Sequence, residues 1–323
     1  MDYTLGQSTV GSLTQALAEA FGDRLQVGGR LAARSVEEVA AALRVAHTWD
    51  GAVTLGPARP GVLSIDLGGL TAVREIDVQS GLVTAEAAIA PRALDAALAD
   101  EGLELHRDLF SDLDGPIGAA IAAGEGAPAI VSLGAVLPDG IVFHTPIAPR
   151  RATGPNPDAL LVGSQGRFAV IAWATLRVCP RQPGALLRAW RGPAAEVLDA
   201  TRRLLRGAVP ELGVRARRGK TGPLTVSWRL PNAAAEAEVA AAMTAAGASA
   251  CEPDDAPPSD GLPRRLGWTA LGRLLARRAP LFVGGMDVHG GYARVPGDAA
   301  GSDALQEAVD AAVDPVGTLR RGR

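Results

Sequence analysis

Residues 154–180 have the sequence GPNPDALLVGSQGRFAVIAWATLRVCP, and the rest of the chain is interpreted around this segment. A turn-rich start is followed by an apolar patch at residues 159–162 and a turn bracketed by Gly163 and Gly166. Residues 168–178 are mainly β-branched, aromatic or aliphatic, which predicts a buried strand that ends at Pro180. The two glycines allow the backbone to turn closely against another strand or a ligand.

Length and composition indicate a globular protein with more than one domain. The chain has 323 residues, enough for two substantial cores, with 47% hydrophobic and 21% charged residues. The net charge is −3 and Lys220 is the single lysine, so nothing favours a nucleic-acid partner. The sequence shows no secretory signal and no apolar run of membrane-spanning length, so we expect a cytoplasmic protein without a membrane span.

The cysteines and histidines do not predict a metal site. Cys179 and Cys251 are too few and too far apart for a disulfide framework or a zinc site. The four histidines show no paired ligand spacing. We therefore expect no metal.

Two loops upstream of residue 154 stand out. Ser35 and Glu38 have capping-box spacing at the start of a helix, and the strand after it enters the loop GPARPG at residues 56–61. The second loop, GPIGAAIAAG at residues 115–124, opens a helix of small residues. A hairpin turn at Asp139 and Gly140 then precedes the segment that we began with. A helix is also expected to begin at Ser12 as its N-cap.

Residues 35–180 resemble the FAD-linked oxidases related to vanillyl-alcohol oxidase, the PCMH-type FAD-binding family, and are closest in layout to the small flavin subunit of glycolate oxidase. The resemblance rests on the opening helix and strand, on the pattern Asp66-Leu67 to Ile76-Asp77, on Pro138-Asp139-Gly140 and on residues 154–180. In that family the two upstream loops cradle the FAD pyrophosphate with backbone N–H groups, and the segment 154–180 lies beside the bound FAD.

The resemblance implies a set of cofactor-binding positions. They are Gly56, Ala58, Arg59, Gly61, Gly115, Ile117, Gly118, Ala119, Gly163, Ser164, Gly166 and Ile171. Both loops are shorter than in the family, and Pro57 and Pro60 have no N–H to donate. Arg59 can supply a phosphate contact in compensation, although an exposed loop arginine is more often solvated. Neither an Arg-x-Gly-His motif nor a flavin-loop cysteine is present, so any FAD would be held non-covalently.

The pattern changes after Pro180. Strands are expected over residues 185–190, 212–217, 224–230 and 248–252, with helices over 193–206 and 233–246. This βαββαβ order is typical of a ferredoxin-like sandwich. After these elements we expect a linker up to residue 263, a helix over residues 266–278 and a hairpin over residues 280–295. We predict an α+β chain: a PCMH-type FAD-binding domain at residues 1–180, then a ferredoxin-like cap domain with a C-terminal tail at residues 181–323.

The best substrate-contacting candidates lie in the segment 284–294, GGMDVHGGYAR, which loosely resembles the end of the small flavin subunit. His289 could act as a base near a substrate C–H or O–H, and Arg294 could hold a carboxylate. The alternative for a glycine-flanked histidine in a hairpin is a structural or solvated role.

Two functions stay open. The resemblance implies a FAD-dependent oxidoreductase, alone or as a subunit of an oxidase complex, that oxidises a small 2-hydroxy acid or alcohol by hydride transfer to flavin. Because both loops are shortened, the alternative is a flavin-free pseudoenzyme that serves as a structural or assembly partner.

Overall fold

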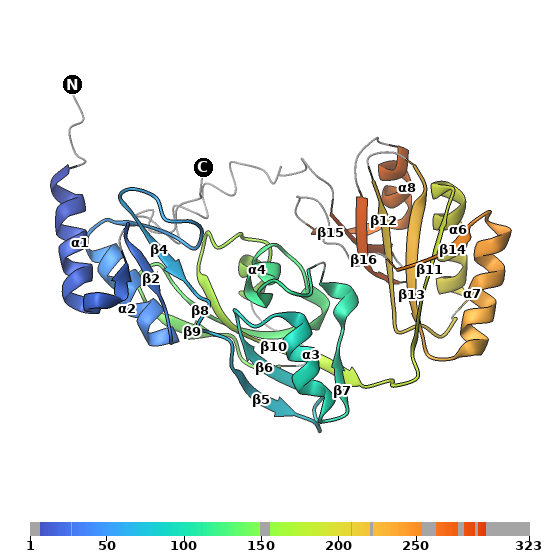
Figure 1. Ribbon diagram of the computed structural model, residues 1–323, viewed down its shortest axis with the longest axis horizontal. Coiled ribbons are helices and arrows are strands. Elements are labelled where there is room, and N and C mark those ends of the chain that lie inside the picture. The colour runs from blue at the N-terminus through green and yellow to red at the C-terminus, as the bar shows by residue number, and fades with distance from the viewer. Residues whose placement is uncertain are drawn as a thin grey trace.

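The computed structural model describes residues 7–26, 28–110, 112–148, 156–207, 209–219, 222–253, 263–276, 281–287 and 290–294. In these ranges the strands form three sheets, and each sheet contributes to its own hydrophobic core. The three layers follow one another along the long axis of the molecule (Figure 1). Helices and strands are mixed in all three, so the chain is α+β as predicted.

The first layer is a four-stranded sheet with two helices. The elements are α1 (Gln7–Phe21), η1 (Gly22–Arg24), β1 (Leu25–Gln26), β2 (Arg30–Ala32), α2 (Val36–Thr48), β3 (Ala52–Thr54) and β4 (Val62–Asp66), and the strand order is β1-β2-β4-β3. Ser35 caps α2 as predicted, because its hydroxyl accepts the N–H of Glu38 at 3.3 Å. The predicted N-cap at Ser12 is wrong: α1 already begins at Gln7, and Ser12 lies inside it.

The second layer is a six-stranded sheet. Its strands are β5 (Val73–Asp77), β6 (Leu82–Glu86), β7 (Leu103–Leu105), β8 (Ile130–Val136), β9 (Val142–His144) and β10 (Val170–Pro180). The order is β5-β6-β10-β8-β9, with β7 paired to the end of β10. Its helices are α3 (Pro91–Ala99), η2 (Arg107–Leu109), α4 (Ile117–Ala122), η3 (Ala127–Ala129) and α5 (Asp158–Leu161).

Strand β10 is the centre of this sheet. It pairs with β6 on one side, with β8 on the other and with β7 at its end, which accounts for its almost continuous burial. The predicted strand ends at Pro180 as expected but begins two residues later. Gly163, Gln165 and Gly166 all have positive φ angles, and Arg167 donates to the carbonyl of Ser164, so the turn extends further into the predicted strand.

The third layer, which we call the C-terminal sandwich (residues 186–294), is a seven-stranded antiparallel sheet. Its elements are β11 (Leu186–Gly192), α6 (Ala194–Arg206), β12 (Gly213–Arg218), β13 (Leu224–Leu230), α7 (Ala233–Ala245), β14 (Ser249–Cys251), β15 (Pro263–Gly267), α8 (Trp268–Ala276), β16 (Leu281–Asp287) and β17 (Gly290–Arg294). The strand order is β14-β11-β13-β12-β16-β17-β15.

The first four of these strands confirm the ferredoxin-like prediction, because β11-α6-β12-β13-α7-β14 is the expected βαββαβ order. Helices α6 and α7 cover the outer face, and the other face of the sheet is turned toward the rest of the molecule (Figure 1). Residues 263–267 were assigned to a linker and a helix start, but they form β15 because β17 offers an antiparallel partner. The predicted final hairpin joins the same sheet through β16.

Candidate functional site

A cavity of about 550 Å³ lies between the first two sheets. The ends of β3, β4 and β6, helix α4, the turn at residues 163–166 and the start of β10 all reach it. Its lining is formed by Leu55, Asp66, Leu67, Gly68, Ala87, Ala88, Asp114, Pro116, Gly118, Ala119, Ala122, Ala123, Gln165, Gly166, Ala169 and Ile171. Small and aliphatic residues predominate, so the cavity can take a flat apolar ring system.

One wall of the cavity is formed where α4 packs closely against the end of β6. A Cβ atom on Gly118 would lie 2.6 Å from the Cβ of Ala87, the residue after β6, so only glycine lets α4 approach this closely. On the other side, Gly163 and Gly166 have φ angles of 78° and 74°, which a residue with a side chain rarely adopts. The Gly163–Gly166 turn predicted from the sequence is therefore real, and it brings Gly166 to the cavity wall.

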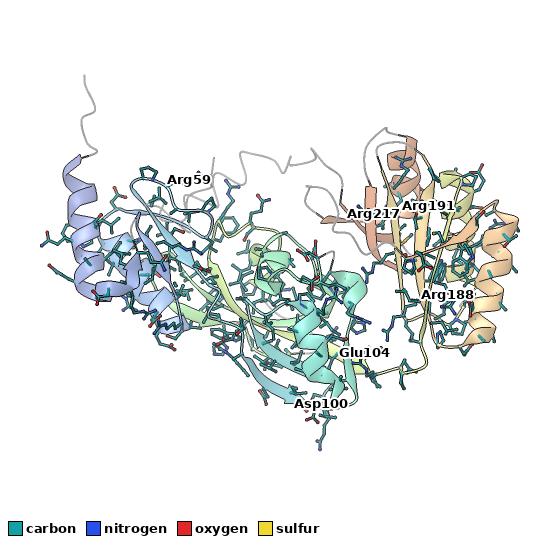
Figure 2. All side chains as sticks on the ribbon, in the orientation of Figure 1. Arg59, Asp100, Glu104, Arg188, Arg191 and Arg217 are labelled. Carbon is teal, nitrogen blue, oxygen red and sulfur yellow. The ribbon has the colours of Figure 1, made fainter. Side chains whose placement is uncertain are left out.

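The loop at residues 56–61 stays away from the cavity lining, to which its neighbour Leu55 contributes. The N–H of Gly56 donates to Thr54 Oγ1 at 3.0 Å, and its carbonyl accepts the hydroxyl of Ser64 at 2.8 Å. The N–H of Val62 donates to the carbonyl of Arg59 at 3.2 Å, which closes the loop on itself. Arg59 belongs to this loop, in the first layer (Figure 2). The four positions predicted here, Gly56, Ala58, Arg59 and Gly61, are not among the lining residues.

The second loop uses its backbone donors internally. The N–H groups of Ile117, Gly118 and Ala119 donate to the carbonyls of Ile89, Ala87 and Pro116 at 2.9, 2.7 and 3.1 Å. Gly115 donates to Asp112 Oδ1 at 3.0 Å. In the turn after α5, the N–H groups of Gly163 and Ser164 donate to the carbonyls of Ile121 and Leu161, both at 3.1 Å. Most predicted phosphate donors thus already have acceptors within the protein.

Two carboxylates lie at the cavity rim, and each forms an ion pair with an arginine. Asp66 accepts the N–H of Gly68 at 2.9 Å and pairs with Arg30 at 2.6 Å, and these contacts hold its pKa below the ordinary value. The hydrogen bond from Arg92 likewise lowers the pKa of Asp114. None of the lining residues, all of them in the described part of the chain, is Arg or Lys. Both carboxylates were missed in the sequence because each reaches the cavity through tertiary packing.

The cavity therefore suits the ring systems of FAD better than its pyrophosphate. The apolar walls suit the isoalloxazine or adenine ring. The rim does not suit the pyrophosphate, which needs free N–H donors or a cation. Here the donors are engaged, and the nearby arginines are already paired with Asp66 and Asp114. Four predicted cofactor positions, Gly118, Ala119, Gly166 and Ile171, line the cavity.

The substrate candidates are placed only in part. Arg294 is the last residue of β17, where its backbone pairs with Pro263 and Phe282. His289 lies outside the described residues. Among the residues that are described, no group of three or more His, Cys, Asp or Glu side chains could hold a metal ion. Within the same ranges, no helix combines the length and apolar character needed to cross a bilayer.

The two layered sheets with a cavity between them, followed by an antiparallel sandwich, define an α+β fold of the PCMH type, which solved structures share. An alkyldihydroxyacetonephosphate synthase has a TM-score of 0.64 to this chain, with 14% identity, covering 90% of this chain and 75% of its own. A glucooligosaccharide oxidase from Acremonium strictum, whose structure is described as showing a novel flavinylation, has a TM-score of 0.56, with 15% identity, covering 75% and 59%. At these identities the likeness is one of fold.

A probable mitochondrial D-lactate dehydrogenase from Danio rerio is 28% identical over an alignment of 201 residues, and the match covers 55% of this chain and 40% of that protein. The chain thus spans about two-fifths of the length of this curated relative. No family model matches the chain. The relatives support the FAD-linked oxidase relationship inferred from the sequence, and none of them singles out the glycolate oxidase subunit.

Proposed function

We propose that this chain is a FAD-dependent oxidoreductase, or the flavin subunit of one, that acts on a small 2-hydroxy acid or similar alcohol. The observation that carries the proposal is the apolar cavity at the junction of the first two sheets, lined by Gly118, Ala119, Gly166 and Ile171. The likeness to a probable D-lactate dehydrogenase favours a 2-hydroxy acid as the substrate class. We further propose that the FAD-binding and cap domains meet after Pro180.

Ala87, Ala119 and Ile171 would contact the ring system, and Gly166 would allow it to lie against the backbone. Bound there, the flavin would supply the hydride acceptor. The protein's part is to exclude water with the small apolar residues and to orient the substrate from the cap, for which His289 as base and Arg294 as carboxylate contact remain our candidates. The flavin would be held non-covalently and weakly.

A second function is favoured by one specific observation. The N–H groups of Gly56, Gly115, Ile117, Gly118 and Gly163 are bonded within the protein, and Asp66 and Asp114 stand at the rim. Each missing contact to a phosphate oxygen is worth about 1.5–3 kcal/mol, so several together lower affinity by decades. The chain would then be a flavin-free structural partner of a flavin-bearing subunit.

The visible absorption spectrum of the purified protein separates the two functions. For a flavoprotein we expect flavin bands either as purified or after incubation with FAD and removal of the unbound FAD, with quenching of FAD fluorescence on binding. Quenching should be weaker in Ala119→Trp, in which a bulky side chain enters the cavity. A colourless protein that takes up no FAD contradicts the oxidoreductase proposal and favours the partner role.

Replacement of residues 56–61 by a longer glycine-rich loop tests why affinity is low. If the rest of the cavity is intact, new N–H donors should raise FAD affinity at least about tenfold, the effect of one added charge-assisted contact. The matched control is a loop of equal length with proline at alternate positions, which adds length without donors. Equal affinity in both grafts would show that donors in this loop are not what limits FAD binding.

A further inference from the structure

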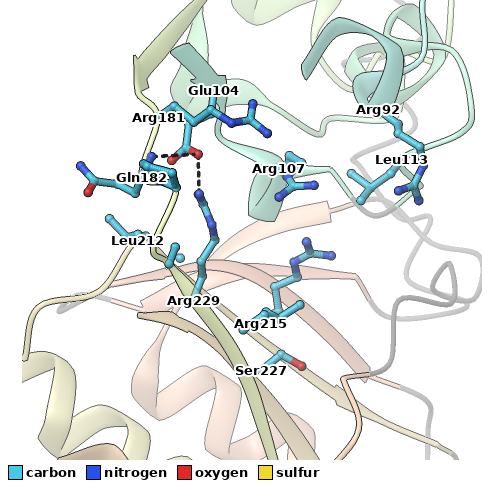
Figure 3. Close-up of a pocket in the computed structure, with 14 residues that line it drawn as sticks. Arg92, Glu104, Arg107, Leu113, Arg181, Gln182, Leu212, Arg215, Ser227 and Arg229 are labelled. Carbon is cyan, nitrogen blue, oxygen red and sulfur yellow. Dashed lines mark hydrogen bonds and ion pairs between the residues drawn. The ribbon is translucent and has the colours of Figure 1, made fainter. Parts of the chain in front are cut away.

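A second pocket, of about 370 Å³, lies between the second sheet and the C-terminal sandwich and shares no lining residue with the cavity described above. Five arginines line it: Arg92, Arg107, Arg181, Arg215 and Arg229 (Figure 3). Glu104 is the one carboxylate in the lining. We propose that this arginine pocket binds a small dianion that carries carboxylate or phosphate groups.

Three of the arginines come from the second layer, on α3, in η2 and just after β10. Arg107 Nε and Arg181 Nη1 each lie 3.8 Å from Asp95 Oδ2. These contacts are ion pairs too long for direct hydrogen bonds. Asp95 is itself buried, and its other oxygen accepts the N–H of Leu105 at 2.8 Å, which fixes its position. One carboxylate thus holds two guanidinium groups side by side at the pocket wall.

Arg181 is held at the pocket wall by charge. Its Nη1 atom is buried beside Asp95 and makes no hydrogen bond in the described part of the protein. The Arg181 side chain as a whole is 37% exposed and lines the pocket, so part of it is accessible to a bound anion.

The other two arginines come from the open face of the C-terminal sandwich. Strands alternate their side chains between faces, and in β12 and β13 the apolar residues pack under α6 and α7. Arg215, Ser227 and Arg229 therefore share the opposite face, and Arg215 is paired in register with Ser227. Arg229 reaches across and pairs with Glu104, as Figure 3 shows. The pocket accordingly has cations from both sides of the junction.

The charge balance indicates the class of ligand. The five arginines are opposed by Glu104 in the lining, by Asp95 behind Arg107 and Arg181, and by Asp114, which pairs with Arg92. The lining itself carries five guanidinium groups and one carboxylate, so its field favours an anion with more than one negative charge. Guanidinium groups bind carboxylate and phosphate oxygens in pairs. The volume suits a small molecule and leaves no room for a polymer.

Isothermal titration calorimetry at pH 8 and constant ionic strength tests the proposal, with malonate as the dicarboxylate probe, inorganic phosphate as the phosphate probe and acetate as the monoanion. At this pH malonate and phosphate are both mainly dianions. We expect saturable binding of malonate or phosphate, at least about tenfold tighter than acetate, and the tighter of the two identifies the ligand chemistry. Binding should weaken about ten- to a hundredfold in Arg215→Ala and in Arg181→Gln.

Arg217→Ala is the matched control, because Arg217 lies on the same face of β12, two residues from Arg215, but outside the pocket lining. It should leave malonate and phosphate binding within about twofold of the unmodified protein. Thermal denaturation of each variant without ligand shows whether it is folded. No saturable binding of either dianion, or equal loss in Arg215→Ala and Arg217→Ala, would overturn the proposal.

Discussion

Gly118 shows at the scale of one residue how the cavity is built. Its missing side chain lets α4 approach β6, where the carbonyl of Ala87 accepts its N–H at 2.7 Å. The sequence resemblance gave this glycine a cofactor role. The structure shows that it is required for close packing and lines the cavity as well. The two roles can be tested separately, because the packing of Gly118 affects the stability of the protein whether or not a ligand is bound.

We expect Gly118→Ala to lower the free energy of unfolding by about 1–3 kcal/mol, because the new methyl group would lie 2.6 Å from Ala87 Cβ and 3.0 Å from its carbonyl oxygen. Urea denaturation followed by far-UV circular dichroism measures the change. The control is Gly56→Ala, whose new Cβ meets only Thr54 Oγ1 at 3.4 Å and should cost less than about 0.5 kcal/mol. Equal midpoints for the two variants would contradict the packing role.

At the scale of one element, the start of α2 combines a cap with an ion pair. Ser35 accepts the N–H of Glu38, and the Glu38 carboxylate accepts the N–H of Arg34 at 2.7 Å and pairs with Arg24. The hydrogen bond from Arg24 is the main cause that lowers the pKa of Glu38 to about 2. The negative charge also lies in the first turn of the helix, where the helix dipole favours it.

This predicts a defined dependence on pH. The carboxylate has a lower pKa in the folded protein than in the unfolded chain, so its contribution is complete above about pH 4.5 and is lost as the pH falls toward 2. Glu38→Gln should therefore cost about 1 kcal/mol at pH 7, a figure reduced for the partial exposure of the pair, and almost nothing near pH 2. Thermal melts between pH 7 and 2.5 measure this.

Glu75→Gln, which removes an exposed carboxylate from β5, is the control and should show no such trend. A stability difference for Glu38→Gln that stays constant from pH 7 to the acid limit would show that charge is not the cause.

At the scale of the whole molecule, one buried ion pair connects the second layer to the C-terminal sandwich. Glu104 is 3% exposed, and it pairs with Arg229 of β13 and also lies 3.5 Å from the N–H of Gln182. Burial works to lower the pKa of Arg229, but the hydrogen bond and the charge of Glu104 outweigh it, so the pKa is raised. The pair thus holds two separate cores together where the arginine pocket lies.

Glu104→Gln should lower the free energy of unfolding by about 3 kcal/mol, because it leaves the charge of Arg229 partly buried without its counter-ion. In a double-mutant cycle with Arg229→Gln we expect a coupling energy above about 1 kcal/mol. The exposed pair of Arg188 and Glu236, inside the sandwich, is the control and should couple by less than about 1 kcal/mol. Chemical denaturation measures both cycles, and equal coupling would contradict a special role for the junction.

The sequence by itself determined the elements whose signals are local. The apolar run that becomes β10, the Ser35 cap, the turn at Gly163 and Gly166 and the βαββαβ order could all be predicted, because each depends on neighbours in the chain. The hairpin of β16 and β17 could be predicted, but its addition to the sandwich sheet could not, since a hairpin does not specify which strand it will join.

Only the tertiary structure decided the sites. It showed that the predicted phosphate donors bond within the protein, and that Asp66 and Asp114 face the cavity. It also gathered arginines that lie between residues 92 and 229 into one pocket. The alternation of polar residues in β12 and β13 was the one sequence signal for that pocket, and it specified a face without its partner. Charge and hydrogen-bond satisfaction depend on which distant groups meet, and that is fixed by packing rather than by local pattern.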